Sequence, residues 1–191
     1  MKLSKKVTSA VLATMLTMSM VVSAFAADAT PSKTDAAEPV KATEAQVDNT
    51  DKSSVDTVDT TAAGKATVAK VENKKTVTIN ANVTVGGVKY AVTTIKANAF
   101  KGATKVKTVK VAAKSISFKK NATKGAKNLT NIKLSKVTKV SQVKFAKKCF
   151  NGSKKLKTIY VSKKTSAKQL KKIKAALKKA GYTKIKVKAT L

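Results

Sequence analysis

Three segments of the chain repeat one pattern of apolar, polar and glycine positions. Residues 100–111, 123–134 and 150–161 each place a glycine at the third position, an aliphatic residue at the seventh and an aliphatic-polar-aliphatic triplet at the end. Because neighbouring side chains of a strand point to opposite faces, each triplet predicts a short strand with two inward side chains and one outward side chain. One such unit cannot bury its inner face alone, so the pattern predicts units stacked on a continuous core.

A second strand pattern precedes the repeats. Apolar and polar residues alternate in residues 76–79, 82–85 and 88–92, and Gly86 and Gly87 separate the last two runs. Both glycines can adopt the positive φ that a tight turn needs, so the pattern predicts an N-terminal β-hairpin within residues 76–95.

After the repeats, the spacing of the apolar residues changes from that of strands to that of a helix. Leu170, Ile173 and Leu177 recur at helical spacing, and Gly181 follows them as a stop signal. Residues 185–187 then repeat the strand triplet. We expect this C-terminal capping helix and last strand, within residues 165–188, to cover the open end of the stack.

The first 65 residues lack these repeats. Residues 1–26 combine early lysines, an apolar stretch and an Ala-Phe-Ala cleavage box, which indicates a secretory signal peptide rather than an uncleaved membrane anchor. Residues 27–65 are rich in Ala, Thr, Asp, Ser and Lys and contain no aromatic residue. This composition predicts a disordered linker, which either lifts the domain off a surface or acts as its internal counterion. The folded domain is expected at residues 66–191, with its repeats at 96–161.

The repeats resemble the BspA-type leucine-rich-repeat family of exported bacterial proteins, over roughly residues 83–187. Their start positions are 23 and 27 residues apart, within the 20–29 residues of leucine-rich repeats. The family's alanine-phenylalanine pair matches at Ala99 and Phe100, whereas Cys149 replaces the alanine of the third unit and Thr123 the aromatic residue of the second. The resemblance implies a β-rich solenoid, a short leucine-rich-repeat array that works by adhesion or molecular binding and has no shared catalytic residues.

Residue types that support catalysis are scarce. The chain has no His, and no Asp or Glu follows Glu72, so the repeats cannot supply a carboxylate pair, a His-based triad or an ordinary metal cage. A Ser-Lys pair remains formally possible. We therefore predict a protein that is not an enzyme, with no catalytic, cofactor-binding or metal-binding residue. The single Cys149 is either a buried small hydrophobe or a route to an intermolecular disulfide.

Charge is the positive signal in this sequence. The formal net charge is +32, and every basic residue is Lys. Stacked strands lie about 4.8 Å apart, so the outward residues of successive triplets are expected to form one ladder on a sheet face. The predicted polyanion-binding residues on and near this ladder are Lys107, Lys110, Lys133, Lys157, Tyr160, Lys184 and Lys186.

Two interpretations of the lysines stay open. They either bind a polyanion or merely solubilise a small repeat protein and protect its strand edges, although a surface of mixed charge would serve solubility without the loss of every carboxylate. Lysine acts as a point charge, and the absence of Arg argues against base-specific or bidentate phosphate recognition. Non-specific charge matching is the expected mode of binding.

The sequence thus predicts a secreted binding or adhesion protein, retained at the cell surface by charge, with no membrane span in the mature chain. The expected partner is an anionic surface or extracellular polymer: teichoic acid, a sulfated glycan or extracellular DNA. One alternative is an adhesin that binds a host protein or another protein and carries incidental charge. A second is a membrane-active cationic protein that acts through the terminal helix, and a weaker third is a protein that compacts nucleic acid.

Overall fold

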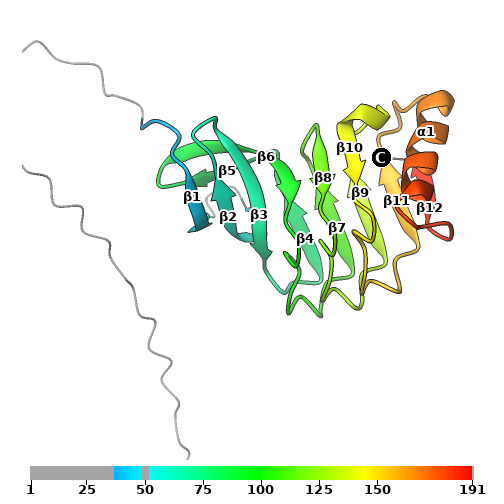
Figure 1. Cartoon of the computed structure of the whole chain (residues 1–191), viewed down its shortest axis with the longest axis horizontal. Helices are drawn as coiled ribbons and strands as arrows, with labels where there is room; N and C mark the ends of the chain where they lie inside the picture. The colour runs from blue at the N-terminus through cyan, green and yellow to red at the C-terminus, as the bar shows by residue number, and fades with distance from the viewer. Residues whose placement is uncertain (1–36, 49–51, 191) are drawn as a thin grey trace, which may run out of the picture. The chain divides into compact units, whose positions relative to one another are not determined.

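The computed structural model describes residues 37–48 and 52–190. These residues form a β-rich domain with one mixed sheet, one all-parallel sheet and one C-terminal α-helix (Figure 1). The signal peptide predicted at residues 1–26 and the start of the predicted linker, residues 27–36, lie outside the described residues.

The parallel sheet contains the strand triplets of the repeats. Its strands lie in the order β12-β11-β9-β7-β4, with bounds Lys186–Ala189, Thr158–Val161, Asn131–Leu134, Thr108–Val111 and Thr76–Ile79. They pair in register, so one inward row runs through Val77, Val109, Ile132, Ile159 and Val187. All five side chains are buried. The prediction of two inward residues and one outward residue per triplet is confirmed for β7, β9 and β11.

The mixed sheet lies opposite and has the order β1-β2-β3-β6-β8-β10, with β5 paired to β6. The bounds of its strands are Ala42–Gln46 for β1, Val55–Thr60 for β2, Lys65–Val71 for β3, Asn82–Val85 for β5, Val88–Ile95 for β6, Ile116–Phe118 for β8 and Val143–Phe145 for β10. The predicted hairpin is β5 and β6, turning at Gly86 and Gly87, which have φ of 55° and 78°. β4, which the prediction grouped with the hairpin, belongs to the other sheet.

Turns of repeated geometry connect the two sheets. Asn98, Asn121 and Lys148 occupy equivalent positions, each with φ near +60°. The Asn98 N–H donates to the Asn121 carbonyl at 3.1 Å, and the Asn121 N–H donates to the Lys148 carbonyl at 3.1 Å. Each unit therefore bonds to the next through its turns as well as through its strands.

The aliphatic residues at the seventh position of each unit anchor these turns. Val106 and Leu129 are 0% exposed and Leu156 is 7% exposed, as the pattern predicts. Thr123 replaces the aromatic residue of the second unit but is also buried, and its hydroxyl lies 2.8 Å from the Ser153 hydroxyl. The second unit therefore keeps the register of its neighbours.

The prediction of disorder for residues 27–65 is wrong where the structure describes this segment. β1 and β2 extend the mixed sheet, and Val55 and Val58 are 0% exposed. Composition predicted disorder because the segment has few apolar residues of its own. Pairing with β3 brings β2 against the domain core, where its two valines are buried. The strand is therefore ordered although its other residues are polar.

Ion pairs also hold β2 against the strands and turns that follow it. Lys96 contacts Asp59 at 2.7 Å and Lys70 contacts Asp56 at 3.4 Å. Burial acts to raise the pKa of Asp59, but hydrogen bonds from Lys96 and from the Glu44 N–H, with the charge of Lys96, lower it below its usual value. The acidic strands thus serve as an internal counterion for the first lysines, which was one of the two roles predicted for the segment.

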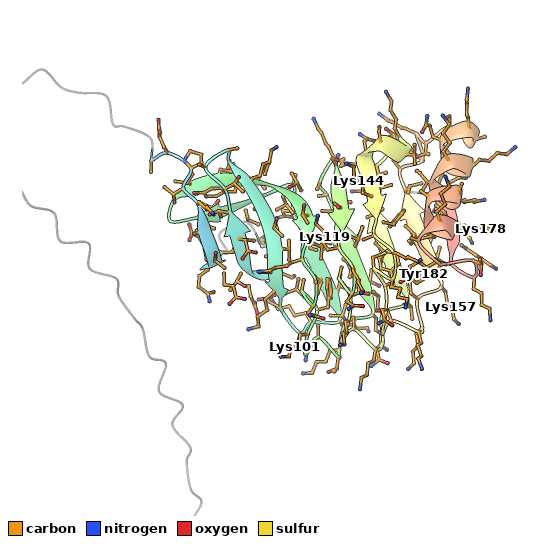
Figure 2. The ribbon with its side chains drawn as sticks, viewed as in Figure 1. Lys101, Lys119, Lys144, Lys157, Lys178 and Tyr182 are labelled. Atoms are coloured by element: carbon orange, nitrogen blue, oxygen red, sulfur yellow. The ribbon has the colours of Figure 1, made fainter. Side chains whose placement is uncertain are left out.

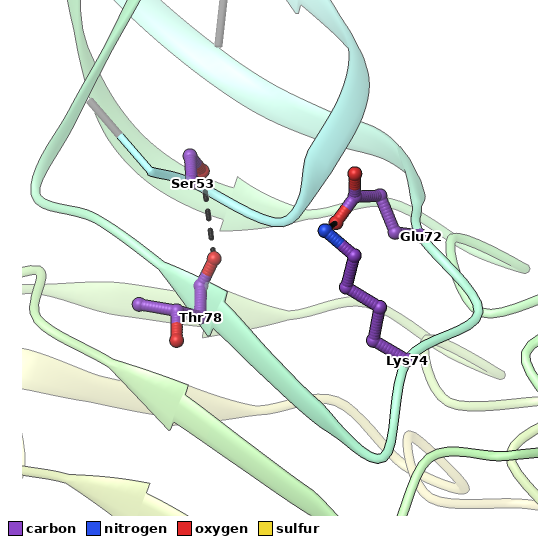
Figure 3. A network of polar contacts seen from close by, with 4 residues as sticks. All are labelled: Ser53, Glu72, Lys74 and Thr78. Carbon is purple, nitrogen blue, oxygen red and sulfur yellow. Dashed lines mark hydrogen bonds and ion pairs between the residues drawn. The ribbon is translucent and has the colours of Figure 1, made fainter. Parts of the chain in front are cut away.

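Residues 53 and 54 close the outer edge of β4. The Ser54 N–H donates to the Thr78 carbonyl at 2.7 Å, and the Ser53 hydroxyl lies 3.4 Å from the same oxygen (Figure 3). Nearby, the Glu72 carboxylate contacts the Lys74 ammonium at 2.7 Å. The Thr78 carbonyl on the outer edge of β4 is therefore bonded, which helps to blunt a free strand edge.

The predicted C-terminal helix is present. Helix α1 (Ala167–Lys179) starts at Ser166, whose hydroxyl accepts from the Gln169 N–H, and it buries Ile173 and Leu177. A short 3-10 helix, η1 (Val140–Gln142), packs against it. No helix of the described residues is long and apolar enough to cross a membrane.

The last strand differs from the prediction by two residues. β12 places Val187 beside Ile159 and Ala189 beside Val161, whereas the sequence pattern put Ile185 and Val187 there. Spacing alone cannot fix this register, because Ile185, Val187 and Ala189 all alternate with lysine.

We expect Leu129→Ala to lower the free energy of unfolding by about 2–5 kcal/mol, because it opens a cavity between two stacked units. Denaturant unfolding measures this, and Lys127→Ala, an exposed change in the same turn, is the control. Equal small effects of the two variants would show that the turns do not share a core.

Limited trypsin digestion of the native protein should leave the Lys65–Ala66 bond intact, because Lys65 belongs to β3, paired on both sides. Val58→Asp should expose this bond, since an unpaired charge is not tolerated at a buried site. Terminal sequencing of the resistant fragment checks both. A fragment of the unaltered protein that begins at Ala66 would contradict the structure.

Candidate polyanion-binding surface

One row of outward side chains runs across the parallel sheet. Because the strands pair in register, the row contains Thr78, Lys110, Lys133, Tyr160 and Lys188. Neighbouring strands lie about 4.8 Å apart, so the side chains follow one another at that interval. The structure thus brings Lys110, Lys133 and Tyr160 together as predicted.

Lys186 does not belong to this row, and its predicted place there is wrong. It lies opposite Thr158, two residues along the strand, and Lys188 takes the position beside Tyr160. Both lysines stand on the same outer face, since they are two residues apart on one strand, and both are exposed. The shift of β12 therefore adds a cation to the face rather than removing one.

The centre of the row is an aromatic contact. The Lys133 ammonium lies 5.8 Å from the centroid of the Tyr160 ring, within reach of a cation–π interaction. Both side chains are half-buried, whereas Lys110 and Lys188 are exposed on either side. We call the set Lys110, Lys133, Tyr160, Lys186 and Lys188 the sheet-face cluster.

Lys107 and Lys157 lie where the parallel strands begin. The Thr130 N–H donates to the Lys107 carbonyl, and the Lys157 N–H donates to the Thr130 carbonyl, both at 2.9 Å. These three residues thus occupy equivalent positions, with exposed lysines on the first and third units (Figure 2 labels Lys157). Lys184 has no equivalent place, because the shift of β12 puts Ile185 at the position directly before the last strand.

The turns carry a second set of lysines that the sequence analysis did not single out. The position after each aromatic or Thr123 holds Lys101, Lys124 or Asn151, and further turn positions add Lys105, Lys127, Lys154 and Lys155. All seven of these residues are exposed, and Figure 2 labels Lys101 among the turns at one edge of the domain. Aligning the three repeats could have predicted this second set of lysines, because residues at equivalent positions of stacked units lie side by side.

The carboxylate side chains that pair with lysine in the described residues come from the N-terminal part of the domain. In the described residues, the three ion pairs between side chains join Lys70, Lys74 and Lys96 to Asp56, Glu72 and Asp59. Within residues 37–48 and 52–190, the lysines of the later units therefore have no ion pair with a carboxylate side chain, and their mutual repulsion acts against the compact state.

The single cysteine, Cys149, is a packing residue. It is buried at the position that Ala99 and Ala122 hold in the earlier units, and burial raises the pKa of its thiol to about 12. The thiol therefore stays protonated at neutral pH, and its burial favours the first of the two predicted roles. In residues 37–48 and 52–190, no group of three or more His, Cys, Asp or Glu side chains is placed to hold a metal ion.

Comparisons with models of known protein families, with curated proteins and with solved structures find no match for this chain. The chemistry of the surface is therefore inferred from its own residues.

We expect the Cys149 thiol to react with an aromatic disulfide reagent only when the protein unfolds, because the sulfur is enclosed and protonated. Cys149→Ala should change the free energy of unfolding by no more than about 1 kcal/mol, since alanine fits this position in two other units. Labelling at the rate of a denatured control would contradict the burial.

Proposed function

We propose that this protein is an exported, non-enzymatic binding protein whose sheet-face cluster holds anionic polymers. We also propose that its stacked units form a short leucine-rich-repeat solenoid of the BspA type. Support for the fold comes from the repeated positive φ at Asn98, Asn121 and Lys148 and from the shared inward row of the parallel sheet. In the parallel sheet, the strand of each unit pairs only with the strands of the adjacent units, as in a repeat protein.

The observation that carries the proposal is the register of the lysines. Parallel pairing fixes Lys110 and Lys133 side by side, and β12 adds Lys186 and Lys188 to the same face. A linear polymer with a charge every few ångströms can contact several of these ammonium groups at once. Each contact releases a counterion, so binding would be favourable at low salt and weaken steeply as salt rises.

The chemistry of lysine limits what the face distinguishes. A lysine ammonium is a point charge that does not read the planar geometry of an anion. Teichoic acid, sulfated glycans and extracellular DNA therefore remain the candidate classes, matched by charge density. With the predicted signal peptide, such binding would retain the secreted protein at an anionic cell surface.

The membrane-active alternative loses support from the position of α1. Its apolar residues Ile173 and Leu177 are buried in the domain core, so the helix presents mainly its lysine side to solvent. A helix that enters a membrane surface needs that apolar side available. This arrangement supports the capping role.

The test is the affinity for heparin and for teichoic acid at salt concentrations from about 50 to 200 mM. Over this range the affinity of the unaltered protein should fall by orders of magnitude. The variant Lys110→Gln, Lys133→Gln, Lys188→Gln should bind more weakly. The magnitude of its slope of log affinity against log salt should be smaller by about two to three.

The control variant is Lys52→Gln, Lys65→Gln, Lys89→Gln, which removes the same charge from exposed positions on the N-terminal strands and the segments beside them. It should keep most of the slope. Equal losses in the two variants, or a flat salt dependence of the unaltered protein, would remove the sheet-face cluster as the binding site.

A further inference from the structure

A groove of about 620 Å³ lies at the C-terminal end of the turn edge. One wall is the last full turn, residues 147–156, and the other is the segment 180–185. This volume is typical of clefts that hold a small molecule. The apolar and aromatic residues that line the groove are Phe150, Leu156, Tyr182 and Ile185. The lysines that line it are Lys147, Lys148, Lys154 and Lys184.

The groove exists because the last unit is shortened. Ten residues lead from Asn98 to Thr108, from Asn121 to Asn131 and from Lys148 to Thr158, the first residues of three parallel strands. Ala180 is the next equivalent position, since its carbonyl accepts from the Lys148 N–H at 3.2 Å, but β12 begins only six residues later at Lys186. The final turn is therefore missing, and the preceding turn is left partly uncovered.

Tyr182 takes over part of the role of the missing turn. Its hydroxyl accepts from the Phe150 N–H at 2.7 Å, and its ring centroid lies 5.2 Å from that of Phe150. These two contacts hold the ring in place, while the side chain remains only half-buried. Figure 2 labels Tyr182 near the end of the domain. The groove thus offers a fixed aromatic surface to a ligand.

Two properties of the lining select the ligand. Four lysines line the groove, and none of its lining residues carries a carboxylate side chain, so an anion is favoured. The apolar and aromatic surface between the lysines favours a ligand that also has an apolar ring face. A bare phosphate or a flexible polyphosphate has the charge but lacks the ring.

We propose that this groove binds one acidic sugar ring, a uronic acid or a sulfated pyranose, with the ring against Tyr182 and the acid group among Lys148, Lys154 and Lys184. The inference deepens the proposed function, on which it rests, because it names an acidic glycan as the polymer. The sheet-face cluster then holds the length of the chain by charge, and the groove recognises a single residue of it.

The probe is a sulfated uronic-acid-containing disaccharide, which fills the groove but is too short to span the sheet-face cluster. Its affinity is measured by calorimetry, and the ring signals of Tyr182 are followed by NMR. The unaltered protein should bind it at least tenfold more tightly than pyrophosphate at equal salt, with a shift of the Tyr182 signals.

The groove variant is Lys148→Asn with Lys184→Gln. Asparagine is chosen at position 148 because Asn98 and Asn121 adopt the same left-handed φ in the earlier turns. This variant should lose at least tenfold in affinity for the disaccharide and keep its melting temperature. The control variant, Lys101→Gln with Lys105→Gln, makes the same charge change two units away and should bind as the unaltered protein does.

The two proposals fail separately in this design. Equal affinity for disaccharide and pyrophosphate, no shift of the Tyr182 signals, or equal losses in the groove and control variants would overturn the groove as a sugar site. If heparin still bound with a steep salt dependence that the sheet-face variant reduced, the proposed function would stand. The sheet-face variant should itself leave disaccharide binding unchanged, and a loss there would also overturn the groove.

Discussion

In-register stacking of equivalent units is the constraint on which the rest of this protein depends. Each unit is too short to bury its inward aliphatic residues alone, and Val109 is buried with Val77 on one side and Ile132 on the other. The same stacking requires a left-handed residue at Asn98, Asn121 and Lys148, where the turn N–H reaches the next unit. A slip of one residue in any strand would turn its aliphatic side chains to solvent.

Stacking also concentrates charge. Any residue type that recurs in the repeat is placed about 4.8 Å from its copy, and here that residue is often lysine. The N-terminal strands relieve part of the repulsion, since Asp59 and Glu72 pair with Lys96 and Lys74. No Asp or Glu follows Glu72, so the later units supply no carboxylate side chain of their own to relieve this repulsion. Under the proposed function, an anionic polymer held by the sheet-face cluster would relieve this repulsion.

The two ends of the stacked units differ in structure and in charge. At the start, residues 53 and 54 bond to the edge of β4, and β1 and β2 extend the mixed sheet. At the other end, α1 covers the core with Ile173 and Leu177, but the shortened last unit leaves a turn open beside Tyr182. The first end is acidic and bonded, whereas the second is basic and carries the groove.

The repeat pattern by itself determined the strand triplets, the buried Val106, Leu129 and Leu156 and the row of Lys110, Lys133 and Tyr160, because period-two alternation and equivalent spacing are local properties. The helical spacing of Leu170, Ile173 and Leu177 determined the C-terminal helix in the same way. Three features needed the tertiary structure. β1 and β2 are ordered because β3 supplies the surface that buries Val58. β12 starts two residues later than expected, because pairing with β11 chooses among alternating positions that the sequence leaves equal. The groove beside Tyr182 exists because a turn is absent, and only the packing of the preceding unit shows what that absence uncovers.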